Sequence, residues 1–211
     1  MSDSILVQLI AMSRRLGDPA LDYAILGEGN TSAQADADTF WVKASGTELR
    51  TIDRAGFVQV YFRRVLDLLD AGQCSDDEVR AGLEAAKVDP AVTVRPSVET
   101  VLHALALQVE GVNFVGHTHP TAVNAVLCSQ RAEEAIAGRL FPDEIVYCGP
   151  ASVYVPYTDP GLPLARAVRD SIARYIDEQG ETPKVILMQN HGLIALGKTS
   201  LEVENVTAMY V

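Results

Sequence analysis

Apolar positions along the chain alternate between helical and strand-like spacing. Residues 5–16 carry apolar side chains at intervals of three and four, which predicts an opening helix ended by the breakers at 17–19. Short β-branched and aromatic runs then predict strands at 31–34, 40–43 and 57–62. The same spacings predict further helices over residues 65–87, 96–110, 120–128, 162–178 and from 201 onward, and further strands over 113–117, 185–188 and 193–196.

Local signals refine three of these segments. Negative charge at residues 76–78 is favourable in the first turn of a helix, so the 65–87 stretch is expected to contain a second helix that begins there. Ser97 is the expected N-cap of the helix that opens at Pro96. Residues 145–155 are expected to form two short strands around Gly149 and Pro150. Together these elements predict a three-layer α/β/α sandwich with a mixed sheet, as one domain over residues 1–211.

Composition and charge narrow the function classes. Hydrophobic residues make up 48% of the chain and charged residues 21%, as in soluble globular domains. A formal net charge of −11 disfavours nucleic acid and anionic lipid as partners and favours a small-molecule substrate. The sequence shows neither an apolar run of about 20 residues nor a signal peptide, so a cytoplasmic protein is expected. The three cysteines at 74, 128 and 148 are expected to be reduced, structural thiols.

Two closely spaced histidines lie at the end of an apolar strand. His117 and His119 are two residues apart, and residues i and i+2 of an extended backbone project from the same face. Both imidazoles can therefore ligate one metal ion about 2 Å from each nitrogen. Taken alone, the pair is equally compatible with two histidines hydrogen-bonded in a loop.

A third histidine favours the metal site. His191 lies between two apolar segments, and Gly192 permits a tight turn there. Three neutral imidazoles with an open fourth position are typical of a catalytic site, because structural zinc sites usually include thiolates. Zn²⁺ is the favoured ion, while Mn²⁺, Co²⁺, Ni²⁺ and Fe²⁺ remain alternatives.

Two further residues on the 96–110 helix have functional and structural interpretations. Glu99 could serve as a metal ligand and as a general base, or it could merely interact favourably with the helix dipole. The functional interpretation is preferred for Glu99. His103 follows it on the same helix face and is expected to pack in the interior with a hydrogen bond.

Two polar loops with glycines could bind an anion. Residues 27–32 form the first loop and residues 43–47 the second. Backbone amides, hydroxyls and Lys43 at such turns can form an anion cradle, although ordinary turn chemistry explains either loop equally well. Neither loop matches a P-loop or a dinucleotide-binding pattern.

Five blocks in order resemble the class II aldolase/adducin family. They are Gly29-Asn30-Thr31-Ser32, Lys43-Ala44-Ser45-Gly46, Pro96-Ser97-Val98-Glu99, His117-Thr118-His119-Pro120 and Asn190-His191-Gly192-Leu193-Ile194-Ala195. The resemblance implies a central mixed, mostly antiparallel sheet, and a cyclic homotetramer with active sites between subunits. It also implies zinc bound by His117, His119 and His191, with Glu99 as acid/base and further ligand. Residues implied near the substrate or its phosphate are Gly29, Asn30, Thr31, Lys43, Ser45, Gly46 and Ser97.

The activity implied is retro-aldol cleavage of a small sugar phosphate or sugar acid through a metal-stabilised enediolate. Sugar-phosphate 4-epimerisation, decarboxylation and dehydration use related chemistry and stay open. A non-catalytic adducin-like binding module is a further alternative, which the retained histidines and Glu99 disfavour.

The chain departs from the family pattern in two places. Val98 stands where many sugar-phosphate aldolases have a second serine, so a phosphate on the substrate stays open. Relatives often have a longer C-terminal tail that supplies a proton donor to a neighbouring subunit. Tyr154, Tyr157 and Tyr210 are the alternatives in this chain.

Overall fold

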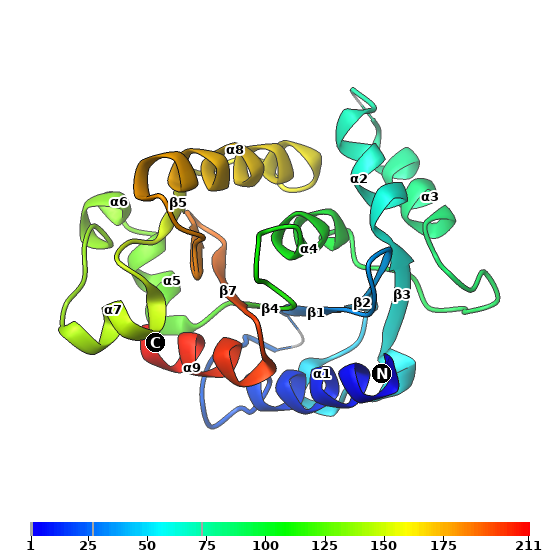
Figure 1. Ribbon diagram of the computed structural model, residues 1–211, viewed down its shortest axis with the longest axis horizontal. Coiled ribbons are helices and arrows are strands. Elements are labelled where there is room, and N and C mark those ends of the chain that lie inside the picture. Colours follow the sequence, from blue (N-terminus) through cyan, green and yellow to red (C-terminus); the bar gives the residue numbers. More distant parts are fainter. Residues whose placement is uncertain (1, 27, 73) are drawn as a thin grey trace.

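A seven-stranded mixed sheet forms the centre of the protein (Figure 1). The computed structural model describes residues 2–26, 28–72 and 74–211. The strand order is β3-β2-β1-β4-β7-β6-β5, and each neighbouring pair is antiparallel except β5 with β6. The strands are β1 (Asn30–Gln34), β2 (Thr39–Lys43), β3 (Phe57–Tyr61), β4 (Phe114–Thr118), β5 (Val153–Val155), β6 (Val185–Met188) and β7 (Gly192–Gly197). The expected mixed, mostly antiparallel sheet is confirmed.

Helices cover both faces of this sheet. One face packs against α1 and α9, and the other against α2, α4 and α8 (Figure 1). The helices are α1 (Ser2–Leu16), α2 (Phe62–Asp70), α3 (Asp76–Ala85), α4 (Thr100–Leu107), α5 (Thr121–Leu127), α6 (Ala132–Ala135), α7 (Pro142–Cys148), α8 (Leu162–Gln179) and α9 (Ser200–Tyr210), with 3-10 turns η1 (Leu49–Thr51) and η2 (Arg54–Gly56). The α/β/α layering is as expected from the sequence.

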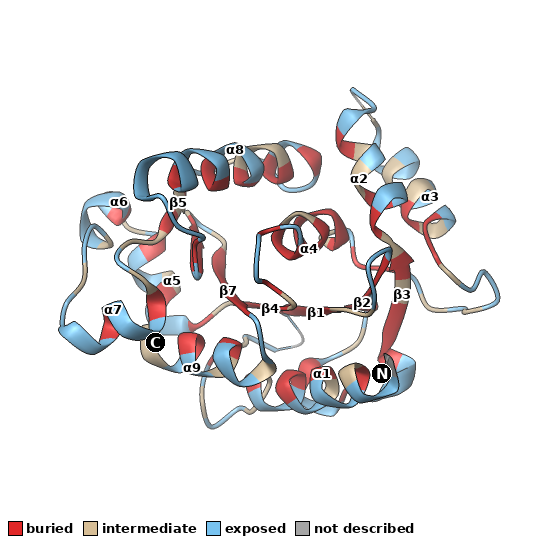
Figure 2. Cartoon of the chain, in the orientation of Figure 1, coloured by how far each residue is buried: buried red, intermediate tan, exposed pale blue. Residues whose placement is uncertain are grey.

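Each face of the sheet has its own apolar core. Phe40, Val60 and Leu102 belong to the core under α2, α4 and α8. Leu9 and Val203 belong to the core under α1 and α9. Because the central strands are covered on both faces, they are buried along their whole length, as the burial colours in Figure 2 show.

The expected strand pair at 145–155 is wrong in its first half. Residues 142–148 form the helix α7, and only Val153–Val155 is a strand. Pro142 occupies the start of α7, and Asp143 and Glu144 lie in its first turn. A proline at the first helical position and acidic residues in the first turn both favour a helix. These signals outweigh the strand propensity of the β-branched residues that follow.

The helix expected from Pro96 begins later than its N-cap signal suggested. α4 starts at Thr100, and Glu99, not Ser97, is its N-cap residue. The Ser97 hydroxyl accepts a hydrogen bond from the Glu99 backbone N–H at 3.3 Å, within a turn that precedes the helix. Glu99 is thereby placed at the junction between turn and helix.

The 65–87 region contains two helices, α2 and α3, and the acidic residues 76–78 open the second, as expected. Strand β3 ends at Tyr61, one residue earlier than expected, because Phe62 already belongs to α2.

The three cysteines are all free. Cys148 is buried as a packing thiol, whereas Cys128 is exposed. Within the described ranges, no helix is long and apolar enough to cross a bilayer.

Candidate metal centre

Three histidines converge at one end of the sheet. His117 lies fully buried in β4, His119 follows the end of that strand, and His191 lies in the turn between β6 and β7. Their candidate ligand nitrogens all lie within 4.8 Å of one another. The ring centres are 4.8, 4.9 and 5.2 Å apart. The expected convergence of the three imidazoles is therefore present.

The pairing of the central strands explains this convergence. β4 and β7 run antiparallel, with Thr118 opposite Leu193, so the end of β4 lies beside the turn that carries His191. Asn190 in that turn has a φ of 57°, a left-handed conformation that asparagine tolerates well. A Cβ on Gly192 would lie 2.6 Å from His119 Cδ2 and from the Thr118 carbonyl oxygen. The turn therefore requires glycine to bring His191 close to His119.

A second glycine brings the first loop against the centre. Gly29 has a φ of 94°, and a Cβ there would lie 2.9 Å from the His117 carbonyl oxygen. Glycine alone adopts this conformation readily and permits the approach. Glu28, its neighbour, consequently reaches His119, and its carboxylate Oε2 lies 2.7 Å from His119 Nδ1.

The donor atoms fit a divalent cation. Nδ1 of His119 donates to Glu28, so its Nε2 presents a lone pair, and this Nε2 lies 3.1 Å from His117 Nε2. Two nitrogens bound tetrahedrally to one zinc ion at about 2.0–2.1 Å lie about 3.3 Å apart. Burial lowers the pKa of His119 to about 4, and the neighbouring His117 acts in the same direction. A neutral imidazole held by an outer carboxylate is the usual form of a histidine ligand.

Glu99 lies between the histidines and the adjoining cavity. Its Oε1 is 3.1 Å from His191 Nε2, its Oε2 is 3.3 Å from His117 Nδ1, and it accepts a hydrogen bond from the Asn30 amide. Burial would raise the pKa of the Glu99 carboxyl. The neighbouring imidazoles of His117 and His191 outweigh burial and hold this pKa well below its usual value. Glu99 is therefore a carboxylate at neutral pH.

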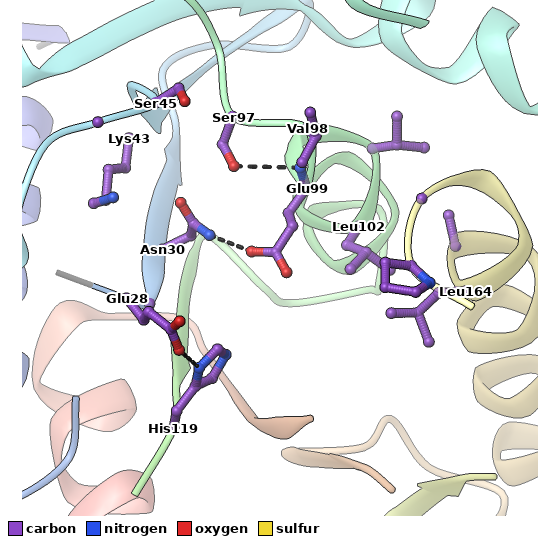
Figure 3. A pocket seen from close by; sticks show the side chains of 16 residues that line it. Glu28, Asn30, Lys43, Ser45, Ser97, Val98, Glu99, Leu102, His119 and Leu164 are labelled. Atoms are coloured by element: carbon purple, nitrogen blue, oxygen red, sulfur yellow. Dashed lines mark hydrogen bonds and ion pairs between the residues drawn. The ribbon is translucent and has the colours of Figure 1, made fainter. Parts of the chain in front are cut away.

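The two polar loops and Ser97 line a cavity of about 290 Å³ beside this carboxylate (Figure 3). The cavity brings together six of the seven expected substrate-binding residues, with Glu99 and His119: Gly29, Asn30, Lys43, Ser45, Gly46 and Ser97. The Lys43 side chain is nearly buried. Burial lowers the pKa of Lys43, while the Glu99 carboxylate opposes this shift.

The seventh residue, Thr31, does not line the cavity. Its hydroxyl lies 2.7 Å from Ser13 Oγ, on the face of the sheet covered by α1. Successive residues of a strand point to opposite faces, so Thr31 points away when Asn30 points in. The expected substrate contact of the Thr31 side chain is thus not supported. Gly27 of the same loop lies outside the described residues.

Sequence reasoning missed two features of the site. It assigned no role to Glu28, which lies 91 residues before His119 in the sequence and meets it through the fold. It also missed the apolar wall formed by Leu102 of α4 and Leu164 of α8, which Figure 3 shows across the cavity from Lys43. The expected packing of His103 is confirmed, since its buried Nδ1 lies 2.7 Å from the Ser32 hydroxyl.

The fold and the site together define an α/β protein with a three-histidine candidate site for a divalent metal ion. Residues 7–210 match the family model described as the Class II Aldolase and Adducin N-terminal domain. The chain belongs to this family.

Two relatives of this chain are named for different activities. The chain is 29% identical over 182 residues to the uncharacterized oxidoreductase YuxG of Bacillus subtilis, an alignment that covers 82% of this chain and 24% of that protein. It therefore spans about a quarter of the length of this relative. It is also 24% identical over 206 residues to a methylthioribulose-1-phosphate dehydratase of Bacillus pumilus, which covers 96% of this chain and 86% of the relative.

Solved structures share the fold. The N-terminal class II aldolase domain of a conserved protein from Thermoplasma acidophilum is 26% identical, with a TM-score of 0.75 over 98% of this chain and 91% of that one. An L-fuculose-1-phosphate aldolase from Thermus thermophilus is 16% identical, with a TM-score of 0.63 over 100% of this chain and 88% of that one. At this identity the second likeness shows the fold alone.

Proposed function

We propose that this protein is a metal-dependent carbon–carbon lyase that cleaves a small sugar phosphate or sugar acid in a retro-aldol reaction. The observation that carries the proposal is the position of Glu99, an ionised carboxylate between three convergent imidazoles and a cavity with a polar wall. His117, His119 and His191 hold the ion, with Glu99 as a further ligand. When bound, a divalent cation such as Zn²⁺ supplies positive charge beside the substrate oxygen on which negative charge develops.

Three residues around the ion transfer the proton and orient the reacting groups. Glu99 accepts and returns the proton of the reacting hydroxyl, because it is ionised at neutral pH and faces the cavity. The amide of Asn30 holds one Glu99 oxygen by a hydrogen bond, which orients the carboxylate. Glu28 keeps His119 in the tautomer that directs its Nε2 toward the other histidines.

An anionic group of the substrate binds at the polar wall of the cavity. Lys43 supplies a positive charge there, and Ser45 and Ser97 supply hydroxyls. No hydrogen bond or ion pair occupies the Lys43 ammonium in the described part of the chain, so it is free to pair with a phosphate or a carboxylate.

Dehydration is the second candidate reaction. The support for it is the likeness over 96% of the chain to the methylthioribulose-1-phosphate dehydratase. Epimerisation and decarboxylation need the same ionised carboxylate and metal site. Product analysis separates them: cleavage gives two carbonyl fragments, dehydration gives one product lighter by a water, epimerisation gives an isomer, and decarboxylation gives carbon dioxide.

We also propose a homotetramer with active sites between subunits. In the single chain, six large apolar side chains along the segment from α5 to α7 are exposed to solvent. They are Val126, Leu140, Phe141, Ile145, Val146 and Tyr147. Exposed apolar side chains in such number are typical of a segment that packs against another subunit. Light scattering after size-exclusion chromatography tests the proposal, and a monomer at micromolar concentration would refute it.

The deciding experiment is metal content by elemental analysis, followed by product analysis with sugar phosphates and sugar acids. We expect about one divalent ion per chain in the wild type and none in a folded His117→Ala/His119→Ala variant. A wild-type protein that binds no metal after incubation with Zn²⁺, Mn²⁺ or Co²⁺ would refute the lyase and favour a binding module.

A further inference from the structure

The turn between β6 and β7, which carries His191, is held by the helix α5. This helix begins two residues after His119, and its buried side chains Val123 and Leu127 pack in the core under α1 and α9. The carbonyl of Leu127, at the end of α5, accepts a hydrogen bond from the Asn190 backbone N–H at 3.3 Å. The same helix therefore follows one histidine of the candidate metal site in the sequence and contacts the turn that carries another.

Asn124 of α5 adds a side-chain contact to this turn. Its Nδ2 donates a hydrogen bond to the backbone carbonyl of His191 at 3.1 Å, across 67 residues of sequence. The His191 backbone N–H donates to the Met188 carbonyl at 3.1 Å, which closes the turn. Peptide units are planar, so bonds on both sides of the His191 Cα fix the direction in which its side chain leaves the turn.

The stability of α5 does not explain why this position holds an asparagine. Asparagine has a lower helix propensity than alanine. The Oδ1 of Asn124 is also buried, and it has no hydrogen-bond partner within residues 2–26, 28–72 and 74–211. A buried acceptor without a partner is unfavourable. The favourable contact of this amide is thus the bond to His191.

We infer that Asn124 is a positioning residue: its amide fixes the backbone from which His191 approaches His117 and His119, so that the three imidazoles are in place before an ion binds. The inference rests on the proposed metal site. A preorganised set of ligands binds more tightly, because less conformational freedom is lost on binding. Glu28 supports His119 through its ring, whereas Asn124 supports His191 through its backbone.

The first test is the zinc affinity of Asn124→Ala, measured by competition with a chelating dye. We expect about tenfold weaker binding, as is usual when a group that orients a metal ligand is lost. Alanine suits a helix better than asparagine and leaves no buried acceptor, so the Tm of the metal-free chain should stay within about 2 °C of the wild type or rise. Wild-type zinc affinity in this variant would overturn the inference.

Two further variants separate the amide from general effects of substitution. Asn113 also donates a side-chain hydrogen bond to a backbone carbonyl, that of Lys198 at 3.2 Å, just past the end of β7 that is remote from His191. Asn113→Ala should therefore keep wild-type zinc affinity. Asn124→Gln retains the amide donor and should stay within about threefold of the wild type. Equal losses in Asn113→Ala and Asn124→Ala, or in Asn124→Gln and Asn124→Ala, would overturn the inference.

The last measurement needs no metal. Hydrogen exchange of the His191 backbone N–H, followed by NMR in the full-length, metal-free chain, reports how often the turn opens. We expect exchange about two- to tenfold faster in Asn124→Ala, the effect of one lost hydrogen bond, and an unchanged rate in Asn113→Ala. An unchanged rate in Asn124→Ala would overturn the inference. If the wild type binds no zinc, the proposed function fails, whereas this exchange rate still decides whether Asn124 holds the turn.

Discussion

At the scale of single residues, the carboxylate of Glu99 is the most direct test of the chemistry. Glu99→Gln keeps the size of the side chain and removes its ability to accept a proton. We expect turnover to fall by about 10²- to 10⁴-fold, with metal content largely retained. Steady-state kinetics and elemental analysis on the same sample measure both. Exposed Glu133, in α6, supplies the matched control, Glu133→Gln, which should change neither quantity. Full activity in Glu99→Gln would remove Glu99 from the mechanism.

Lys43 is expected to lower the stability of the folded chain while it binds the anionic group of the substrate. Its pKa in the folded chain lies below the ordinary 10.5, so the charged form costs stability at neutral pH. The cost is fully present below the folded pKa and disappears as the pH rises through the folded pKa toward 10.5. Lys43→Met should therefore raise Tm at pH 7, with no such gain near pH 11, and lower kcat/KM by about 10- to 100-fold. A variant with lower Tm and full activity would contradict both expectations.

The sequence predicted most of the residues that the structure brings together at the candidate site. Three histidines, Glu99 and the two polar loops could be chosen because metal ligands and anion cradles require specific side chains at specific spacings. The direction of the Thr31 side chain could not be predicted. Which residues of a strand point to which face of the sheet depends on the pairing register of the strand. Glu28 was missed for a related reason: its contact with His119 depends on the left-handed backbone of Gly29.

At the scale of elements, the turn between β6 and β7 determines how closely His191 approaches its neighbours. A Cβ at Gly192 would meet His119 and the Thr118 carbonyl at 2.6 Å, and a backbone atom cannot move aside easily. We expect Gly192→Ala to lower the free energy of unfolding by about 1–3 kcal/mol and to weaken zinc binding at least about tenfold. Denaturant titration and dye competition measure the two effects.

Gly180 offers the control for that variant. It has a φ of 70° at the end of α8, and a Cβ there would meet nothing within 4 Å. Gly180→Ala should cost about 1–2 kcal/mol through backbone strain alone and leave zinc affinity unchanged. Weakened zinc binding in this variant as well would show that general destabilisation, not the contact with His119, explains Gly192→Ala.

Element types were predictable where the apolar pattern was regular, and less so where helix and strand signals conflicted. The strands β4, β6 and β7 and the helices α1 and α8 follow from their apolar spacing. The error at residues 145–148 arose because Ile145, Val146 and Tyr147 have strand propensity, yet all three are exposed on α7 while Cys148 is buried. Tertiary packing of the buried side chains of Glu144 and Cys148 and the helix-start signals at 142–144 outweighed that weak propensity.

At the scale of the whole molecule, the metal ion should stabilise the folded chain. A ligand that binds only the native state at 100 times its Kd adds about 2.7 kcal/mol. For a chain of this size, each kcal/mol raises Tm by about 2–4 °C. We expect saturating Zn²⁺ to raise Tm of the metal-free protein by roughly 5–10 °C in differential scanning calorimetry. The His117→Ala/His119→Ala variant should show no rise, and an equal rise in that variant would place the ion elsewhere.

The strand order also determines when the centre can form during synthesis. β4 pairs with β1 on one side and with β7 on the other, so distant segments have to meet before the sheet closes. Pairings of this kind are slow, and a chain emerges from the ribosome N-terminus first. A nascent chain that has exposed residues 1–190 carries His117 and His119 but lacks the third ligand. Capture of the ion by all three histidines therefore has to wait until His191 has emerged and β7 has paired with β4, and a translation-arrested chain that lacks His191 should not retain zinc.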